Sequence, residues 1–144
     1  MERDQRGDDS EGDGEEEREL PVEGSRPRRG ALRQADEDPE GDGNPSARRH
    51  HTLSYDSQRG VVVLFGGQDS SGSRSDLWEW DGVSWHEITP TDPEGDGNPS
   101  VRNSHSLAYD AARGVVVLFG GWSGSNRLSD TWEYDGLSWT QITL

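Results

Sequence analysis

Residues 38–90 recur as residues 92–144, with a constant offset of 54 positions and no insertion or deletion between the two copies. His51 in the first copy therefore matches His105 in the second. Tandem repeats with a period near 50 residues are typical of arrays in which each copy is one supersecondary unit that cannot bury its apolar surface alone. We expect two similar units, each of which needs a neighbour to pack against.

The chain is too polar to form one well-filled domain of its length. Of its 144 residues, 27% are hydrophobic and 30% are charged, and the net charge is −15. Residues 1–37 hold few apolar side chains, so burial there cannot offset the entropy lost on ordering. We therefore predict a disordered acidic tail over residues 1–37, a first folded repeat over residues 38–91 and a second over residues 92–144.

The charge and the residue types also argue against several classes of partner. Binding to nucleic acid or to an anionic membrane surface requires an excess of Arg and Lys, whereas this chain has 14 basic residues against 29 acidic ones. No apolar run approaches the length of a transmembrane helix. Because the sequence contains no cysteine, it has no disulfide, thiolate metal site or cysteine nucleophile. We expect neither a nucleic-acid partner nor a membrane partner.

Each repeat carries four strand signals and no helical periodicity. In the first repeat these are HTLSY, in which apolar residues alternate, the β-branched run VVVLF, the aromatic segment LWEW and the segment SWHEIT. Turn residues separate them: Asp56 and Gly60 follow the first strand, Gly66 and Gly67 end the second, and an Asp-Gly pair follows the third. Four short antiparallel strands in sequence order form a meander, and one meander per repeat of this length is a propeller blade.

The residue pattern resembles the kelch repeat. The second copy reads YD, then RGVVVLFGG, then DTWEYDG and a final W, and the first copy follows the same order. The resemblance covers residues 48–89 and 102–143 and implies that each copy is one blade of a β-propeller. The residues that match the family's structural positions are Gly66, Gly67, Trp78 and Trp85 in the first blade and Gly120, Gly121, Trp132 and Trp139 in the second.

The number of copies departs from this family, since kelch propellers close with about five to seven blades. Two blades leave two outer faces of Val, Leu, Phe and Trp in water. Three alternatives stay open: the chain packs against further kelch blades of a longer propeller, several copies associate as a homo-oligomer such as a trimer with six blades, or the product folds poorly. The expected fold class is all-β, with two four-stranded antiparallel kelch-like blades, an incomplete β-propeller, after the tail.

The connections of a meander alternate between its two ends, so the loops after the second strands and the inter-blade linkers should emerge at one end. Loops 68–75 and 122–129 differ most between the copies, and variable loops on a fixed scaffold often bind partners. Trp122 stands where the first copy has Gln68, and it either contacts a partner or covers the edge of its blade. The residues that we predict for the partner-binding face are Trp122, Asn126, Arg127, Arg74, Arg48 and Arg102.

The linker DPEGDGNPS occurs twice and could hold a hard cation through its oxygen side chains. The match to a calcium loop fails where the bidentate Glu should stand, because Arg49 and Asn103 occupy that position. We favour an acidic Gly/Pro turn, and we expect neither a metal nor a cofactor. The calcium candidates, should the linkers bind a cation, are Asp38, Glu40 and Asp42 in the first linker and Asp92, Glu94 and Asp96 in the second.

His51 and His105 open the first strand of each copy. They could contact an anion or a ligand in a propeller channel. We favour the alternative, in which each histidine forms a hydrogen bond with the neighbouring blade.

The sequence contains no convincing catalytic constellation. GGWSGS lacks the spacing of a nucleophile elbow, and the Gly-Gly turns lack the Lys and the helix N-terminus of a phosphate loop. We therefore predict a non-enzymatic binding module that presents its inter-blade and second-to-third-strand loops to a protein partner. The alternatives are a carbohydrate-binding module, in which Trp122 stacks on a glycan, and a truncated accessory propeller domain of a larger secreted protein.

Overall fold

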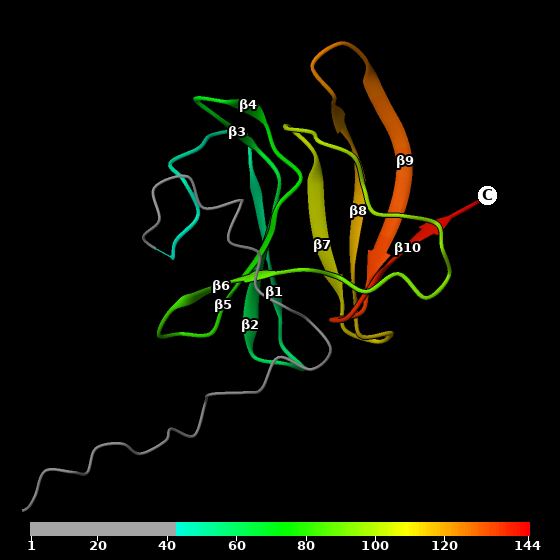
Figure 1. The fold of residues 1–144 in the computed structure, drawn as a ribbon. Helices are drawn as coiled ribbons and strands as arrows, with labels where there is room; N and C mark the ends of the chain where they lie inside the picture. The colour runs from blue at the N-terminus through cyan, green and yellow to red at the C-terminus, as the bar shows by residue number, and fades with distance from the viewer. Residues whose placement is uncertain (1–42) are drawn as a thin grey trace, which may run out of the picture.

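The computed structural model of the chain describes residues 43–144. The predicted acidic tail, the first residues of the first repeat and the calcium candidates Asp38, Glu40 and Asp42 lie outside the described residues. The described part consists of strands and their connections and contains no helix, so the predicted all-β class is confirmed (Figure 1). Within residues 43–144 there is accordingly no helix of the length and apolarity needed to cross a membrane.

Two four-stranded antiparallel sheets stand side by side, and each sheet is one blade (Figure 1). Blade 1 has the strand order β1-β2-β5-β6, and blade 2 has the order β7-β8-β9-β10. A two-stranded hairpin, β3-β4, extends blade 1 between β2 and β5. The strands are β1 (Thr52–Asp56), β2 (Val61–Phe65), β3 (Gln68–Asp69), β4 (Gly72–Ser73), β5 (Leu77–Trp80), β6 (Trp85–Ile88), β7 (Ser106–Asp110), β8 (Val115–Trp122), β9 (Arg127–Tyr134) and β10 (Trp139–Ile142).

The turns that join the first two strands of each blade follow from an Asp and a Gly at fixed positions. The Asp56 carboxylate accepts the backbone N–H of Arg59 at 3.0 Å, and Gly60 takes a φ of 70°. Asp110 and Gly114, which takes a φ of 71°, repeat this arrangement in blade 2. Positive φ is the region that glycine adopts without steric cost, so the turn predicted from these residues forms in both blades.

Successive residues of a strand point to opposite faces, so each blade has two faces. Val61, Val63 and Phe65 of β2 lie on the face of blade 1 that packs against blade 2. Val116 and Leu118 of β8 lie on the face of blade 2 that receives them. The buried cluster between the blades consists of Val61, Val63, Phe65, Leu77 and Ile88 from blade 1 and of Val116, Leu118, Trp132, Tyr134 and Trp139 from blade 2, with Leu107 and Tyr109 at its edge.

The remaining two faces are the outer faces of the molecule. On blade 1 the outer face carries Leu53 and Tyr55, which are 50% and 58% exposed. On blade 2 it carries Phe119, which is 54% exposed. The VVVLF run is identical in the two blades, but its first, third and fifth residues face the interface in blade 1, whereas its second and fourth do so in blade 2. Exposed apolar side chains are present on both outer faces, as expected of a chain with two blades.

A polar bridge crosses the interface beside the apolar cluster. Tyr134 Oη donates to Glu79 Oε2 at 2.8 Å, and Arg59 Nη2 donates to the same oxygen at 2.7 Å. The Arg59 guanidinium also lies 5.6 Å from the centre of the Tyr134 ring. Burial, reinforced by the charge of Glu79, raises the pKa of Tyr134 well above its usual range, so the phenol stays a donor. The buried Glu79 carboxylate is thus compensated by two donors, one from each blade.

Blade 2 differs from the expectation at its central hairpin. The sequence predicted a strand over residues 115–119 followed by a loop, but β8 continues to Trp122 and β9 begins at Arg127. The pairing register shifts between Phe119 and Gly121. Gly120 and Gly121, at φ 71° and 109°, act as a bulge inside the hairpin instead of ending the strand.

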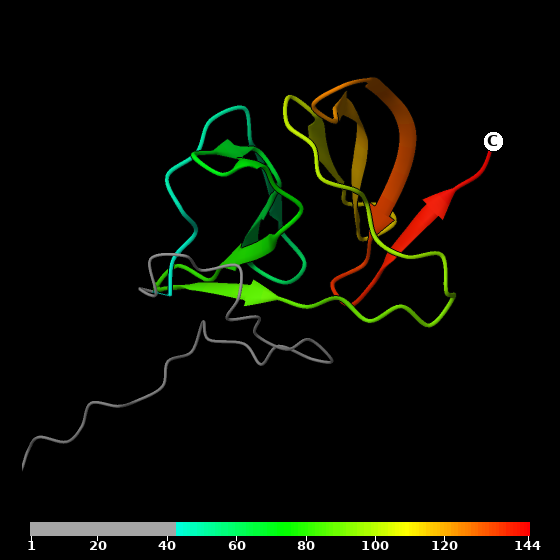
Figure 2. The ribbon, with the colours of Figure 1, turned by 45° about the horizontal axis from the view of Figure 1, so that its top comes forward.

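The inter-blade linker leaves β6 and passes beside β10 before it reaches the loops (Figure 2). Thr91 N donates to the carbonyl of Leu137 at 2.9 Å, and Asp96 accepts the backbone N–H of Gln141 at 2.8 Å. Because the sheet is twisted, the outermost strand of blade 1, β6, runs at an angle to the inner strands. The linker that follows β6 therefore starts beside blade 2. At the end of the linker Arg102 pairs with Arg74 and Asn103 pairs with Trp122, which places these two residues at the end of the blades where the β8-β9 hairpin lies.

Candidate functional site

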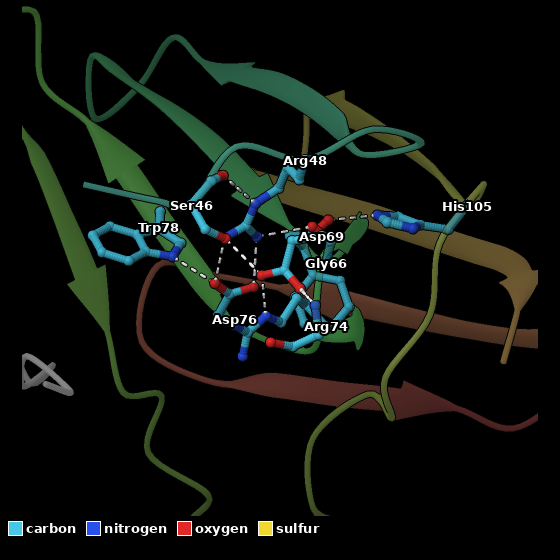
Figure 3. A network of polar contacts seen from close by, with 10 residues as sticks. Ser46, Arg48, Gly66, Asp69, Arg74, Asp76, Trp78 and His105 are labelled. Atoms are coloured by element: carbon cyan, nitrogen blue, oxygen red, sulfur yellow. Dashed lines mark hydrogen bonds and ion pairs between the residues drawn. The ribbon is translucent and has the colours of Figure 1, made fainter. Parts of the chain in front are cut away.

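An arginine that precedes the first strand is held inside its blade. Arg48 donates to both carboxylate oxygens of Asp76, at 2.7 and 2.9 Å, and to the carbonyl of Gly66 at 3.1 Å (Figure 3). Trp78 Nε1 donates to the same carboxylate at 2.8 Å. We refer to Arg48, Asp76 and Trp78 as the arginine clamp of blade 1. The clamp fixes the chain before β1 to the start of β5.

Blade 2 has the same clamp, formed by Arg102, Asp130 and Trp132. Arg102 donates to Asp130 at 2.7 and 2.8 Å and to the carbonyl of Gly120 at 3.0 Å, and Trp132 Nε1 donates to Asp130 at 2.9 Å. Arg102 is 0% exposed. Its hydrogen bonds hold the pKa of Asp130 below the usual range, so this carboxylate stays charged.

The clamps engage two residues that the sequence suggested for the partner-binding face. The side chains of Arg48 and Arg102 are 4% and 0% exposed and hold the segments beneath the loops. Their direct contact with a partner stays a prediction. Sequence reasoning missed the clamps. The signal was present, because Arg and Asp are separated by 28 residues in both repeats.

A second ion pair fixes the β3-β4 hairpin of blade 1. Asp69 accepts Ser46 Oγ at 2.7 Å and Arg74 Nε at 2.6 Å (Figure 3). Burial alone would raise the pKa of Asp69, but these two hydrogen bonds lower it. Blade 2 has Ser123 and Leu128 at the equivalent positions, so the tip of its hairpin lacks this ion pair.

Trp122 lies at the tip of the β8-β9 hairpin with its backbone fixed on both sides. Its N–H and carbonyl pair with Asn103 at 2.8 and 3.0 Å, and Arg127 is its partner across the hairpin. Asn103 Nδ2 also donates to Ser73 Oγ at 2.8 Å, so Asn103 connects the hairpins of the two blades. The Trp122 side chain is nevertheless 41% exposed.

Arg127 and Asn126 lie next to Trp122 and are both exposed. Residues directly opposite on paired strands point to the same face of the sheet, so Trp122 and Arg127 share one face. Ser123 N donates to the carbonyl of Asn126 at 2.9 Å and closes the tip. The structure thus brings together three of the six residues predicted for the partner-binding face, with Arg74 on the neighbouring hairpin.

The glycines that match the family's structural positions allow backbone segments to approach one another closely, across the blades at Gly66 and within one blade at the other three. All four take positive φ. A Cβ atom on Gly66 would lie 2.8 Å from the carbonyl of Arg102, and one on Gly121 would lie 2.9 Å from the carbonyl of Asn103. A side chain at Gly66 or Gly121 would therefore push the segment before β7 away from the hairpins.

The acidic linker between the blades is fixed by ordinary hydrogen bonds. Asp92 accepts the backbone N–H groups of Gly95 and Gly97, each at 3.0 Å, and Glu94 accepts the hydroxyl of Thr140 at 3.3 Å. One carboxylate oxygen from each of Asp92, Glu94 and Asp96 lies within 4.8 Å of the other two. Exposed acidic turns form such groups without a metal, and the acidic turn remains the interpretation that we favour.

His105 forms a hydrogen bond with the neighbouring blade, as predicted, whereas His51 lies exposed on the outer face of blade 1, where the structure describes no neighbouring blade. The Nε2 of His105 lies 2.7 Å from the carbonyl oxygen of Phe65, to which it donates, and the side chain is buried. Burial lowers the pKa of His105 to about 4, because the charged imidazolium is poorly solvated between the blades. His105 is therefore neutral at pH 7 and contributes to packing.

Acidification is expected to destabilise the chain through His105. Its pKa is lower in the folded state than in the unfolded state, so the stability is complete above pH 6.5 and is lost as the pH falls towards 4. Between pH 7.5 and pH 4.5 the free energy of unfolding should fall by about 2 kcal/mol from this group. Urea unfolding at the two pH values measures the change. The variant His105→Gln should lack this share of the pH dependence, and an equal loss in wild type and variant would contradict the assignment.

A comparison with protein-family models finds a match over most of the chain. The model described as the KLHDC2/KLHL20/DRC7 Kelch-repeats domain matches residues 33–144, which includes both blades. Domains of this kind are generally protein-binding modules without enzymatic activity. The match agrees with the resemblance that the sequence motifs indicated.

Proposed function

Because the chain belongs to the kelch-repeat family, we propose that it is a non-enzymatic module that binds a protein partner through the hairpin tips of its two blades. The proposed surface consists of the tip of the β8-β9 hairpin and the adjoining β3-β4 hairpin. The two clamps keep the chain beneath these hairpins fixed, so the surface is preorganised. Preorganisation favours binding because less conformational freedom is lost when the partner docks.

The observation that carries the proposal is the combination of exposure and rigidity at Trp122. Its side chain is 41% exposed although its backbone is hydrogen-bonded to Asn103 and the hairpin continues on its other side. Arg127 lies opposite on the same face. Trp and Arg are the residue types most enriched among the few contacts that dominate protein interfaces.

Selection of peptides from an unbiased phage-displayed random library on the immobilised chain tests this surface. Enriched peptides should bind wild type at least about tenfold more tightly than the Trp122→Ser variant, because loss of a central interface Trp typically costs about 2 kcal/mol or more. Arg127→Ser should weaken the same peptides by a smaller factor.

The control is Val83→Ser, which also removes an exposed apolar side chain but lies in the β5-β6 turn at the other end of blade 1. It should leave peptide binding unchanged. Enriched peptides that bind Trp122→Ser as well as wild type, or that are lost on Val83→Ser, would show that the hairpin tips are not the binding surface.

A further inference from the structure

The outer face of blade 1 contains an open socket of about 440 Å³. It is lined by Asn44, Pro45, Ser46, Arg48, His51, Leu53, Leu64 and Trp85. Each of these eight residues is identical to the one at the equivalent position of blade 2, namely Asn98, Pro99, Ser100, Arg102, His105, Leu107, Leu118 and Trp139.

In blade 2 the corresponding place is filled by a side chain of blade 1. The ring of Phe65 lies 5.6 Å from the ring of His105 and 5.3 Å from that of Trp139, in edge-on geometry, and Phe65 is buried. His105 Nε2 donates to the carbonyl of the same phenylalanine at 2.7 Å. Phe65 is therefore a knob that fits a socket with this lining.

An equivalent knob stands on the opposite outer face. Phe119 matches Phe65 in the repeat and is 54% exposed on blade 2. The molecule thus presents a knob on one flank and a socket with the same lining on the other. We propose that copies of this chain associate head to tail, with Phe119 of one copy filling the socket of the next. This proposal concerns the flanks of the blades and is independent of the hairpin tips.

The polar groups that accompany the internal knob are repeated on the outer faces. Thr52 Oγ1 donates to the carbonyl of His105 at 2.8 Å across the internal interface. Ser106, which matches Thr52, and His51, which matches His105, are both exposed. In the head-to-tail contact the Ser106 hydroxyl donates to the carbonyl of His51 in the next copy, and His51 donates to the carbonyl of Phe119.

A contact between two different surfaces repeats until the rotation closes a ring or produces a fibre. Propellers close with about four to eight blades, so two to four copies complete a ring, and three copies give six blades. The contact between copies should be weaker than the contact between the two blades of one chain. Beside Phe65, blade 1 contributes the apolar Leu77 to the internal interface, whereas the equivalent residue beside Phe119 is the more polar Thr131. The association is therefore reversible on dilution.

Sedimentation of the full chain over a range of concentrations tests the association. We expect a discrete species of two to four chains that dissociates on dilution, whereas Phe119→Arg sediments as a single chain with an unchanged near-UV circular dichroism spectrum. Ser125→Arg adds the same charge at the β8-β9 tip and should associate like wild type. Wild type that stays a single chain, wild type that forms an open-ended series of masses, or Phe119→Arg that associates like wild type would overturn the proposal.

Disulfide trapping tests the direction of the contact. Because the sequence contains no cysteine, only the introduced thiols can form a disulfide. The variants His51→Cys and Ser106→Cys each place one thiol on a different flank. After oxidation, a mixture of the two should give a covalent pair, because residue 106 of one copy meets residue 51 of the next. Each variant oxidised by itself should stay a single chain. No covalent pair in the mixture, or equal cross-linking of either variant alone, would overturn the head-to-tail arrangement.

Discussion

Replacing Trp139 by alanine is expected to lower the free energy of unfolding by about 3–5 kcal/mol. Trp139 is 0% exposed at the centre of the interface between the blades, with its ring 5.3 Å from Phe65 and 5.2 Å from Tyr134. Truncation removes the apolar contact of both blades and leaves a cavity that the sheets can close only in part. Urea unfolding followed by circular dichroism measures the loss.

Trp85 provides a matched control for this substitution. It has the same side chain at the same position of the repeat, but it lies on the outer face of blade 1, where it packs against Trp80 at 5.5 Å and stays half-buried. Both variants are measured in a chain that also carries Phe119→Arg. This substitution prevents the proposed association, so no second copy covers Trp85 on the outer face of blade 1. Trp85→Ala should then cost less than half as much as Trp139→Ala. Equal losses would mean that packing between the blades is not the main source of stability.

The sequence was a good guide to the elements within each blade. Strand alternation, the Asp and Gly turn residues and the repeat offset predicted both meanders, because these signals are local. The sequence could not tell which face of VVVLF would be buried in which blade. The two runs are identical, and only the order of the blades along the chain decides that Phe65 is covered while Phe119 is exposed.

The candidate site was harder to predict for a similar reason. Arg48 and Arg102 precede the first strands in polar segments, which is typical of surface residues, yet their partners Asp76 and Asp130 lie far away in sequence. Charge pairs between distant segments leave no periodic signal in one copy. The extension of β8 to Trp122 was also missed, because Gly-Gly more often ends a strand than forms a bulge within a hairpin.

Replacing Arg102 by methionine is expected to lower the free energy of unfolding by about 2–3 kcal/mol, because Arg102 is fully buried while the Asp130 carboxylate that loses its partner is 25% exposed and partly solvated. Methionine fills much of the space but donates no hydrogen bond. Asp130 would keep the indole of Trp132 as a donor but lose both bonds from Arg102, and the carbonyl of Gly120 would lose its guanidinium donor. Chemical denaturation gives the energy. Carboxyl-carbon NMR should show that the pKa of Asp130 rises, since Arg102 is the main cause that lowers it in wild type.

Arg113→Met is the matched control for the clamp, because Arg113 also contacts two acidic groups, Asp110 at 2.8 Å and Glu133 at 2.6 Å. These contacts lie at the surface, where water screens the charges and solvates a carboxylate that loses its partner. The control should therefore lose only a small fraction of the stability that Arg102→Met loses. Equal losses of the free energy of unfolding in the two variants would contradict the role of the clamp. An unchanged pKa of Asp130 in Arg102→Met would contradict it as well. If the two losses differ as expected, the residues beneath the hairpin tips supply the rigidity that the proposed binding surface requires.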